Sequence, residues 1–174
     1  MSDYVLVQHE SPLATIIFNR PDQRNAISYD MWRELASTLA DLDSDQDIRT
    51  IVFAGAGDEA FSAGADIKDF QEYRSDSQKG ALYNDAVNGL LAQLHSMATP
   101  TISMIDGFAV GGGCELAIAT DLRIASEGSR FGIPTLFLCP ATFLLYHLEQ
   151  FIHFGLRRSY FTIIPFNLQT KKLL

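Results

Sequence analysis

The 174-residue chain is poor in cysteine and in basic residues, and each shortage excludes a class of protein. Cys114 and Cys139 form no CxxC pattern and are too few for a disulfide scaffold, so we interpret both as reduced thiols of a cytoplasmic protein. Lys and Arg number 13 against 21 Asp and Glu. The net charge of −8 argues against a nucleic-acid partner, because binding a phosphate backbone needs clustered cations. A few local cations can still hold one phosphorylated ligand.

Long hydrophobic runs are also missing before Thr135. No window there approaches the roughly 18 uncharged apolar residues of a membrane span, so we expect none. Residues 1–4 lack a basic start followed by an apolar run, and we therefore expect no signal peptide. What is present, 47% hydrophobic and 20% charged residues, is typical of a globular protein with one domain and a substantial core.

Short β-branched runs alternate with longer stretches of helical period, which predicts an α/β fold in layers. A hairpin is expected around Pro12, and a helix from an N-cap at Ser28 to about residue 42. Pro100 ends a second long helix. We interpret residues 130–134 as a turn. The expected strands are residues 4–8, 14–18, 49–54, 101–105 and 122–126, and the second helix is residues 77–97.

A glycine-rich stretch follows the strand at residues 101–105. It contains three consecutive glycines, residues 111–113, and then Glu115, before a helical apolar pattern at residues 116–119. Glycine allows a positive φ and lets another molecule approach the main chain closely. A helix that begins there points unpaired N–H groups and a positive dipole end at its ligand. The stretch therefore predicts an anion or oxyanion pocket, with Glu115 about one turn inside the helix.

A second loop of small residues follows the strand at residues 49–54. After a turn at residues 55–58, residues 61–65 lead into a helix that we expect to begin at Asp66. We interpret Asp66 as a helix N-cap rather than a catalytic acid. The two loops have the same design, a strand followed by Gly and Ala and then a helix.

The composition changes after Pro134. Residues 136–174 contain a single acid, Glu149, and runs of aromatic and aliphatic residues without a clean amphipathic period. We therefore divide the chain into a core at residues 1–135 and an atypical hydrophobic tail at residues 136–174. Either the tail packs on the core or on a partner, or it is not the native end of such a domain and arises from a frameshift or a truncation.

Three segments, in this order and spacing, resemble the enoyl-CoA hydratase/isomerase family, the crotonase superfamily. The resemblance covers roughly residues 4–134, and the joint pattern is specific where each piece alone is weak. The segments are Asn19-Arg20-Pro21-x-x-x-Asn25-Ala26, Phe61-Ser62-Ala63-Gly64-Ala65-Asp66-Ile67, and Asp106-Gly107-Phe108-Ala109-Val110-Gly111-Gly112-Gly113-Cys114-Glu115-Leu116-Ala117 with Asp121.

The resemblance implies a crotonase-like spiral of ββα units that assembles as trimers or pairs of trimers and binds acyl-CoA thioesters. It implies that the backbone N–H groups of Ala65 and Gly112 form an oxyanion hole and that Arg24 helps at the nucleotide end of CoA. No metal or redox cofactor is implied, since CoA is part of the substrate. The residues implied to line the substrate are Arg24, Ala26, Ala63, Ala65, Asp66, Ile67, Gly111 and Gly112.

The implied chemistry agrees with the residues. Two backbone donors aimed at a developing thioester oxyanion supply a few kcal/mol each in a dry site. Glu115 is well placed to activate water or to move a proton at Cα or Cβ. The alternative for Glu115 is a first-turn acid that only complements the helix dipole. Two other candidates are weaker: Cys114 is interpreted as a small buried thiol, and the tail set of Cys139, His147, Glu149 and His153 as no metal site.

Hydratases of this family carry a second glutamate directly after a Phe-Gly-x-Pro turn. Here that turn is followed by Thr135, and a Thr hydroxyl is neither an acid nor a base near neutral pH. Three functions stay open: hydration, a one-carboxylate reaction such as moving a double bond with Glu115 alone, and a non-catalytic or inactive truncated CoA-binding fragment.

Overall fold

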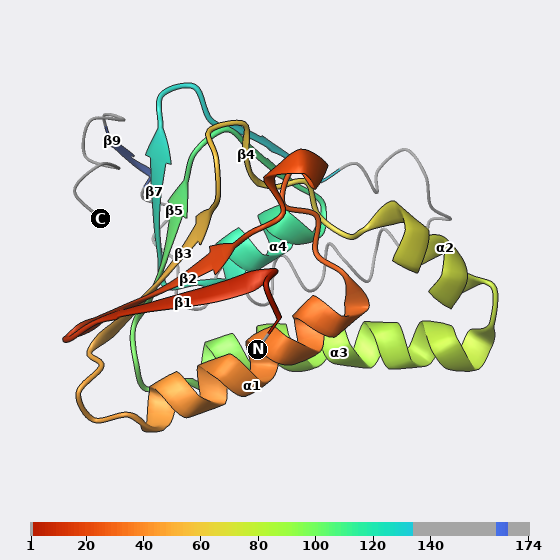
Figure 1. The fold of residues 1–174 in the computed structure, drawn as a ribbon, viewed down its shortest axis with the longest axis horizontal. Helices are drawn as coiled ribbons and strands as arrows, with labels where there is room; N and C mark the ends of the chain where they lie inside the picture. Colours follow the sequence, from red (N-terminus) through yellow and green to blue (C-terminus); the bar gives the residue numbers. More distant parts are fainter. Residues whose placement is uncertain (1, 134–162, 167–174) are drawn as a thin grey trace.

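The computed structural model describes residues 2–133 and 163–166, which form two sheets with helices packed around them (Figure 1). The larger sheet has the strand order β1-β2-β3-β5-β7-β9, and the smaller has the order β4-β6-β8. The strands of the larger sheet are β1 (Val5–Glu10), β2 (Leu13–Phe18), β3 (Thr50–Gly55), β5 (Thr101–Ile105), β7 (Leu122–Ser126) and β9 (Ile163–Phe166). Those of the smaller sheet are β4 (Ala60–Ser62), β6 (Phe108–Val110) and β8 (Arg130–Gly132).

The chain winds as a spiral in which each turn adds one strand to each sheet. β3 is followed by β4, β5 by β6 and β7 by β8, and helices connect one pair to the next. All pairings are parallel except the β1–β2 hairpin. The predicted crotonase-like spiral of ββα units is therefore confirmed. The helices are η1 (Pro21–Gln23), α1 (Tyr29–Ser44), α2 (Ile67–Arg74), α3 (Ser77–Ser96) and α4 (Gly112–Ala119).

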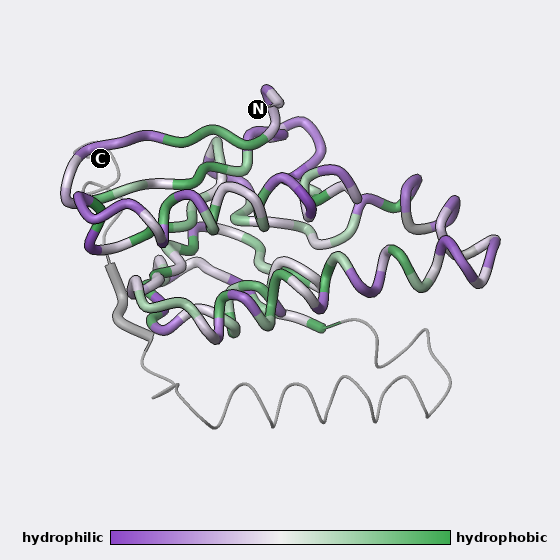
Figure 2. Tube along the Cα trace, turned by 90° about the horizontal axis from the view of Figure 1, so that it is seen from below, coloured by the Kyte–Doolittle hydropathy of each residue, from purple (hydrophilic) through white to green (hydrophobic). Residues whose placement is uncertain are grey.

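The core lies between the larger sheet and the paired helices α1 and α3. The apolar stripe of α1 that the sequence predicts is buried, with Leu35 and Leu39 fully inaccessible, and it packs beside Leu90 and Leu94 of α3. Figure 2 shows hydrophobic residues concentrated along the strands, while hydrophilic residues follow the outer turns of the helices. Burying each large apolar side chain contributes about 1.5–3 kcal/mol, so this layer provides much of the stability.

Ser28 begins α1 as predicted, and its Oγ accepts a hydrogen bond from the Met31 N–H at 3.3 Å. The expected strands and the helix that ends before Pro100 are confirmed within one or two residues. The interpretation of residues 130–134 as a turn is wrong, because Arg130–Gly132 forms β8 and pairs with β6. Three-residue strands such as β8 are too short for a period-two pattern, and they form because the spiral supplies a paired neighbour.

The C-terminal residues that the structure describes, Ile163–Phe166, form β9 and pair with β7 at the edge of the larger sheet. The proposed division at residue 135 stays a prediction, since most of the tail lies outside the described residues. Among the helices that are described, none is long and apolar enough to cross a membrane.

The N-cap of α1 can be tested by Ser28→Ala, with Ser37→Ala as the matched control on the same helix. Ser28→Ala removes the acceptor of the Met31 N–H and should lower the free energy of unfolding by about 1 kcal/mol. Ser37 is exposed and its Oγ donates only to Glu34 O, so its change should stay within about 0.5 kcal/mol. Urea denaturation measures both, and equal stabilities of the two variants would contradict the capping role.

Candidate active site

Two backbone loops meet where the smaller sheet ends. One contains Gly64 and Ala65 after β4, and the other contains Gly111 and Gly112 after β6. Gly64 has φ +93°, and a Cβ there would lie 2.6 Å from Val110 O and 2.9 Å from Gly112 N. A Cβ on Gly112 would lie 3.7 Å from Ala65 N. The two positions predicted to supply backbone donors are therefore neighbours in space.

In the part of the chain that the structure describes, each of these loops has a backbone N–H without an acceptor. Ile27 donates to Gly64 O at 2.7 Å and accepts from Asp66 N at 2.9 Å, so the Ala65 N–H lies between two engaged groups. Gly112 is the first residue of α4. Within residues 2–133 and 163–166, neither the Ala65 N–H nor the Gly112 N–H has a hydrogen-bond acceptor. Two adjacent free donors, one of them at a helix N-terminus, suit an anionic oxygen.

The sharp turn into α4 places Gly111 and Glu115. Gly111 is the N-cap with φ 54° and ψ −126°, and its N–H donates to Gly132 O at 2.8 Å. Glu115 N donates to Gly111 O at 3.0 Å, which confirms that Glu115 lies in the first turn of the helix. The Glu115 side chain is half-buried on the same helix turn that supplies the free Gly112 N–H.

Cys114 precedes Glu115 in the chain and Tyr83 feels its charge, and both Cys114 and Tyr83 have raised pKa values that keep them neutral near pH 7. Burial, together with the charge of Glu115, raises the pKa of the Cys114 thiol to about 11. Burial raises the pKa of Tyr83 to about 12, and the charges of Asp69, Asp66 and Glu115 add to the effect. The interpretation of Cys114 as a small buried thiol is therefore confirmed.

Trp32 forms an apolar wall directly behind Gly112. Its ring carbon Cζ2 would lie 3.1 Å from a Cβ on Gly112, so even a methyl group there would press on the indole. Trp32 Nε1 donates to Tyr83 Oη at 3.1 Å, which ties α1 to α3 at this point. The sequence predicts Trp32 as a core residue, which it is, but no pattern in the sequence indicates its contact with the glycine loop or the partner Tyr83.

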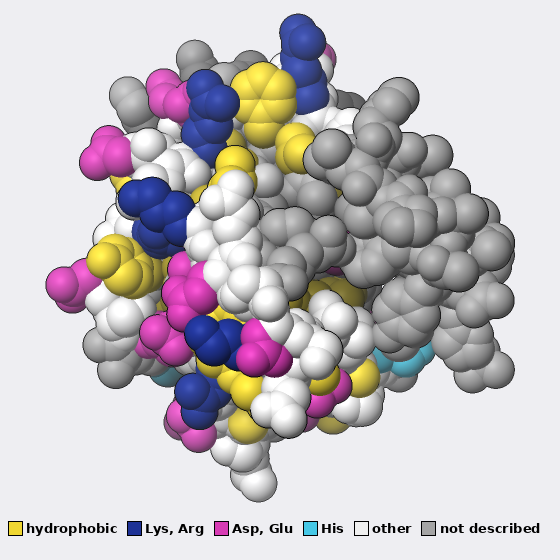
Figure 3. All heavy atoms as spheres, turned by 90° about the vertical axis from the view of Figure 1, so that its right-hand side faces the viewer, with side chains coloured by type: hydrophobic (Ala, Val, Ile, Leu, Met, Phe, Trp, Pro, Cys, Tyr) yellow, Lys and Arg dark blue, Asp and Glu magenta, His cyan; other side chains and the backbone are white. Residues whose placement is uncertain are grey.

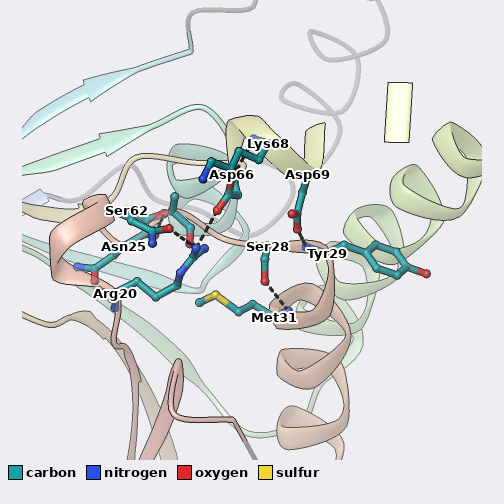
Figure 4. Close-up of polar contacts among 11 residues, drawn as sticks. Arg20, Asn25, Ser28, Tyr29, Met31, Ser62, Asp66, Lys68 and Asp69 are labelled. Carbon is teal, nitrogen blue, oxygen red and sulfur yellow. Dashed lines mark hydrogen bonds and ion pairs between the residues drawn. The ribbon is translucent and has the colours of Figure 1, made fainter. Parts of the chain in front are cut away.

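Asp66 is the N-cap of α2, as predicted, and its Oδ1 accepts from Lys68 N at 3.0 Å. Its Oδ2 accepts from Arg20 Nη2 at 2.8 Å (Figure 4). Burial raises the pKa of Asp66, but the Arg20 guanidinium and the Lys68 and Asp69 N–H groups outweigh it and hold the pKa below its ordinary value. Ile67, the first residue of α2, is 72% exposed.

The residues expected near CoA border the same loop. Arg24 is exposed, and its Nε lies 2.6 Å from Glu59 Oε1. Ala63 N donates to Arg24 O at 2.8 Å, which joins this segment to the Ala65 loop. Ala26 is half-buried, and its carbonyl accepts from Arg20 Nη1 at 2.8 Å. The two loops thus meet at one end of the smaller sheet, and the segment after β2 runs beside β4, with the Arg24 side chain at Glu59, just before β4 begins.

The outer surface beyond this end, around α2 and α3, carries acidic and basic side chains interspersed with apolar ones (Figure 3). Lys79 Nζ lies 3.1 Å from Glu72 Oε1 in one such exposed pair. Among the described residues no group of three or more His, Cys, Asp or Glu side chains gathers as metal ligands do. Thr135 and the tail set of Cys139, His147, Glu149 and His153 lie outside the described residues.

A family model for enoyl-CoA hydratase/isomerase matches residues 8–145 of the chain. The chain belongs to the enoyl-CoA hydratase/isomerase family. It is similar to the short-chain-enoyl-CoA hydratase of Clostridium acetobutylicum, at 34% identity over 130 residues that cover 75% of this chain and 49% of the relative. It is 40% identical over 121 residues to the mitochondrial enoyl-CoA hydratase domain-containing protein 2 of Mus musculus, covering 70% of this chain and 40% of the relative.

Solved structures of the family share the fold. A crystal structure of an enoyl-CoA hydratase/carnithine racemase from Magnetospirillum magneticum superposes with a TM-score of 0.77 at 32% identity, covering 86% of this chain and 57% of that one. The chain spans about half the length of the curated relatives it matches. Within that half lie both glycine loops and Glu115.

The meeting of the loops in this family member can be tested by Gly64→Ala, with Gly89→Ala as the control. A methyl on Gly64 would meet Val110 O at 2.6 Å in a backbone conformation that favours glycine, so unfolding free energy should fall by more than about 2 kcal/mol. Gly89 lies in α3 with open space around it, and alanine there should stabilise the helix by about 0.5–1 kcal/mol. Chemical denaturation decides, and a neutral Gly64→Ala would contradict the close contact.

Proposed function

We propose that this chain acts on acyl-CoA thioesters by holding the thioester oxygen between the Ala65 N–H and the Gly112 N–H while Glu115 moves a proton. The observation that carries the proposal is the pair of neighbouring backbone donors without acceptors in the described part of the chain, next to a carboxylate on the same helix as one of them. Family membership supports the substrate class.

Charge develops on the thioester oxygen when a proton leaves the neighbouring carbon or when a nucleophile adds to the double bond. Backbone donors fixed by the fold need no reorganisation at that moment, and removing one such donor typically slows a reaction about 10²–10³-fold. Trp32 keeps water away from the back of the Gly112 loop, which strengthens the donors further. The two N–H groups therefore favour the enolate over the ground state.

The proton is assigned to Glu115. In double-bond isomerisation one carboxylate takes a proton from Cα of a 3-enoyl thioester and returns it to Cγ, so Glu115 alone suffices. In hydration, water adds across the double bond and a second acid or base assists. The position after the Phe-Gly-x-Pro motif that would supply it is Thr135, outside the described residues. The proposal therefore favours isomerisation as the reaction that the described side chains can complete.

The CoA portion is proposed to lie along Arg24, Ala26 and Ala63 and past the start of α2, with Asp66, Ile67 and Gly111 lining the path to the thioester. Arg24 would exchange its exposed Glu59 partner for a CoA phosphate. No metal or redox cofactor takes part in this proposal, because CoA is itself part of the substrate. Assembly as a trimer or hexamer and a cytoplasmic location remain predictions.

Glu115→Gln tests the proton transfer. The control is Glu127→Gln, which removes the same negative charge at an exposed position. Crotonyl-CoA hydration and 3-enoyl-CoA isomerisation should be measured on the purified chain. Glu115→Gln should lower kcat about 10²–10⁴-fold with CoA-ester binding retained, and Glu127→Gln should change neither. Unchanged turnover in Glu115→Gln would contradict the assignment. A wild-type chain that binds CoA esters without turnover would instead be a non-catalytic or inactive CoA-binding fragment.

Arg24→Ala tests whether Arg24 binds the nucleotide end of CoA. The control is Arg49→Ala, a change of another exposed arginine, which directly precedes β3. Loss of one exposed phosphate contact should raise KM for an acyl-CoA about three- to tenfold. The corresponding acyl-pantetheine, which lacks the nucleotide, should be used equally well by both variants and by the wild type. A rise in KM that is the same for both thioesters would place Arg24 away from the nucleotide.

A further inference from the structure

The segment after β2 is joined to the Ala65 loop by a network of buried polar side chains that has no part in the proton transfer or in binding CoA (Figure 4). Its centre is Asn25, which is fully buried and has φ 55°. Ser62 Oγ donates to Asn25 O at 2.8 Å and accepts from Gly64 N at 3.1 Å. The Asn25 amide in turn accepts from Arg20 N at 3.0 Å and donates to Ala60 O at 2.6 Å. The backbone of residues 60–64, directly before Ala65, is therefore held in place by the Asn25 and Ser62 hydrogen bonds.

Arg20 holds the other side of the same loop. Nη1 donates to Ala26 O and Nη2 to Asp66 Oδ2, each at 2.8 Å, and Nη2 also donates to Gln23 Oε1. The side chains of Arg20 and Asp66 are only 11% and 13% exposed. The guanidinium carbon lies 5.2 Å from the centre of the Tyr4 ring, which covers the ion pair further.

The Arg20–Asp66 ion pair lies next to the backbone that carries the Ala65 N–H. Ala26 and Asp66 flank the short bridge between Ile27 and Ala65, in which Gly64 O and Asp66 N bind Ile27. Arg20 therefore joins the two segments of the chain that form this bridge, by bonding to Ala26 in one and to Asp66 in the other. The Ala65 N–H belongs to the Gly64–Ala65 peptide group, which meets the Ala65–Asp66 peptide group at Ala65 Cα. A displacement of Asp66 therefore acts on this N–H through the two backbone dihedral angles of Ala65.

We propose that the Arg20–Asp66 ion pair is a positioning device for the Ala65 N–H, and that it acts on turnover through this backbone donor without contact to the reacting atoms. The inference rests on the proposed function of Ala65. A partly buried ion pair contributes little net stability, because desolvation opposes the attraction. Charge-assisted hydrogen bonds nevertheless have short, directed geometry, and a displacement of about 1 Å in an active site can cost roughly 10²-fold in rate.

Asp66→Asn separates the ion pair from the helix cap. Asn still accepts from Lys68 N as an N-cap, but it presents no charge to Arg20. Asp69→Asn is the matched control, because it makes the same charge change in the first turn of α2. The Asp69 side chain accepts from Tyr29 N at 2.8 Å through Oδ2, and among the described residues no hydrogen bond joins this side chain to the Ala65 loop. The Asp69 backbone N–H that bonds to Asp66 is unchanged in Asp69→Asn. Arg20→Gln removes the other partner, and Arg20→Gln with Asp66→Asn removes both.

Kinetics distinguish positioning from direct contact with CoA. Asp66→Asn and Arg20→Gln should each lower kcat about ten- to hundredfold, which is part of the loss expected on removing an oxyanion donor, and should change KM for the CoA ester far less. The double variant should lose no more than the worse single variant, since both act on one element. Asp69→Asn should keep wild-type kcat. An unchanged kcat in Asp66→Asn, losses that multiply, or a change in KM alone would overturn the inference.

Amide hydrogen exchange of the ligand-free chain, followed by NMR, separates this inference from the proposed function. The Ile27 and Asp66 N–H groups should exchange faster in Asp66→Asn and Arg20→Gln, and at the wild-type rate in Asp69→Asn. Unchanged exchange overturns the inference even if the wild type is active. If the two variants exchange faster but the wild-type chain shows no turnover, the proposed function is overturned and the inference about the ion pair is not. If Arg20→Gln does not fold, Arg20→Lys replaces it and should exchange at an intermediate rate, because Lys keeps the charge but not both bonds.

Discussion

The contact between the Gly64 backbone and the backbone of Val110 to Gly112 is the constraint on which the rest of this site depends. It holds only because residue 64 has no side chain and a φ of +93°. Elements that are far apart in the chain converge to maintain it. Trp32 packs behind Gly112, Asn25 and Ser62 lie beneath Gly64, and Arg20 fixes the side of Ala65. Much of the polar side-chain bonding at this end of the molecule thus holds main chain in place.

The sequence predicts those parts of the fold that a local pattern determines. The stripe of α1, the Ser28 cap and the strand runs of the larger sheet are periodic or follow from one residue's chemistry, and all are confirmed. The strands of the smaller sheet are not predicted, because three residues carry no period. The turn expected at residues 130–134 failed for the same reason.

The site divides in the same way. The glycine loop, the Asp66 cap and the place of Glu115 in the first turn of α4 follow from residues next to one another in sequence. The Arg20–Asp66 and Trp32–Tyr83 bonds join residues 46 and 51 positions apart, and no spacing indicates such partners. Asp66 shows the difficulty most clearly, since one carboxylate both caps a helix and binds a guanidinium, while the family resemblance implies a third role beside CoA.

The spiral itself sets the distance between the two donors. In the smaller sheet β4 and β6 are adjacent, and Ser62 is paired with Ala109. Ala65 and Gly112 each follow their paired residue at the same offset along the chain. Neighbouring strands lie about 4.8 Å apart, which is a separation at which two N–H groups can both reach a single oxygen at about 2.9 Å. The proposed site for one oxygen atom would thus follow from the strand spacing of a β-sheet, continued for one loop beyond the last paired residue.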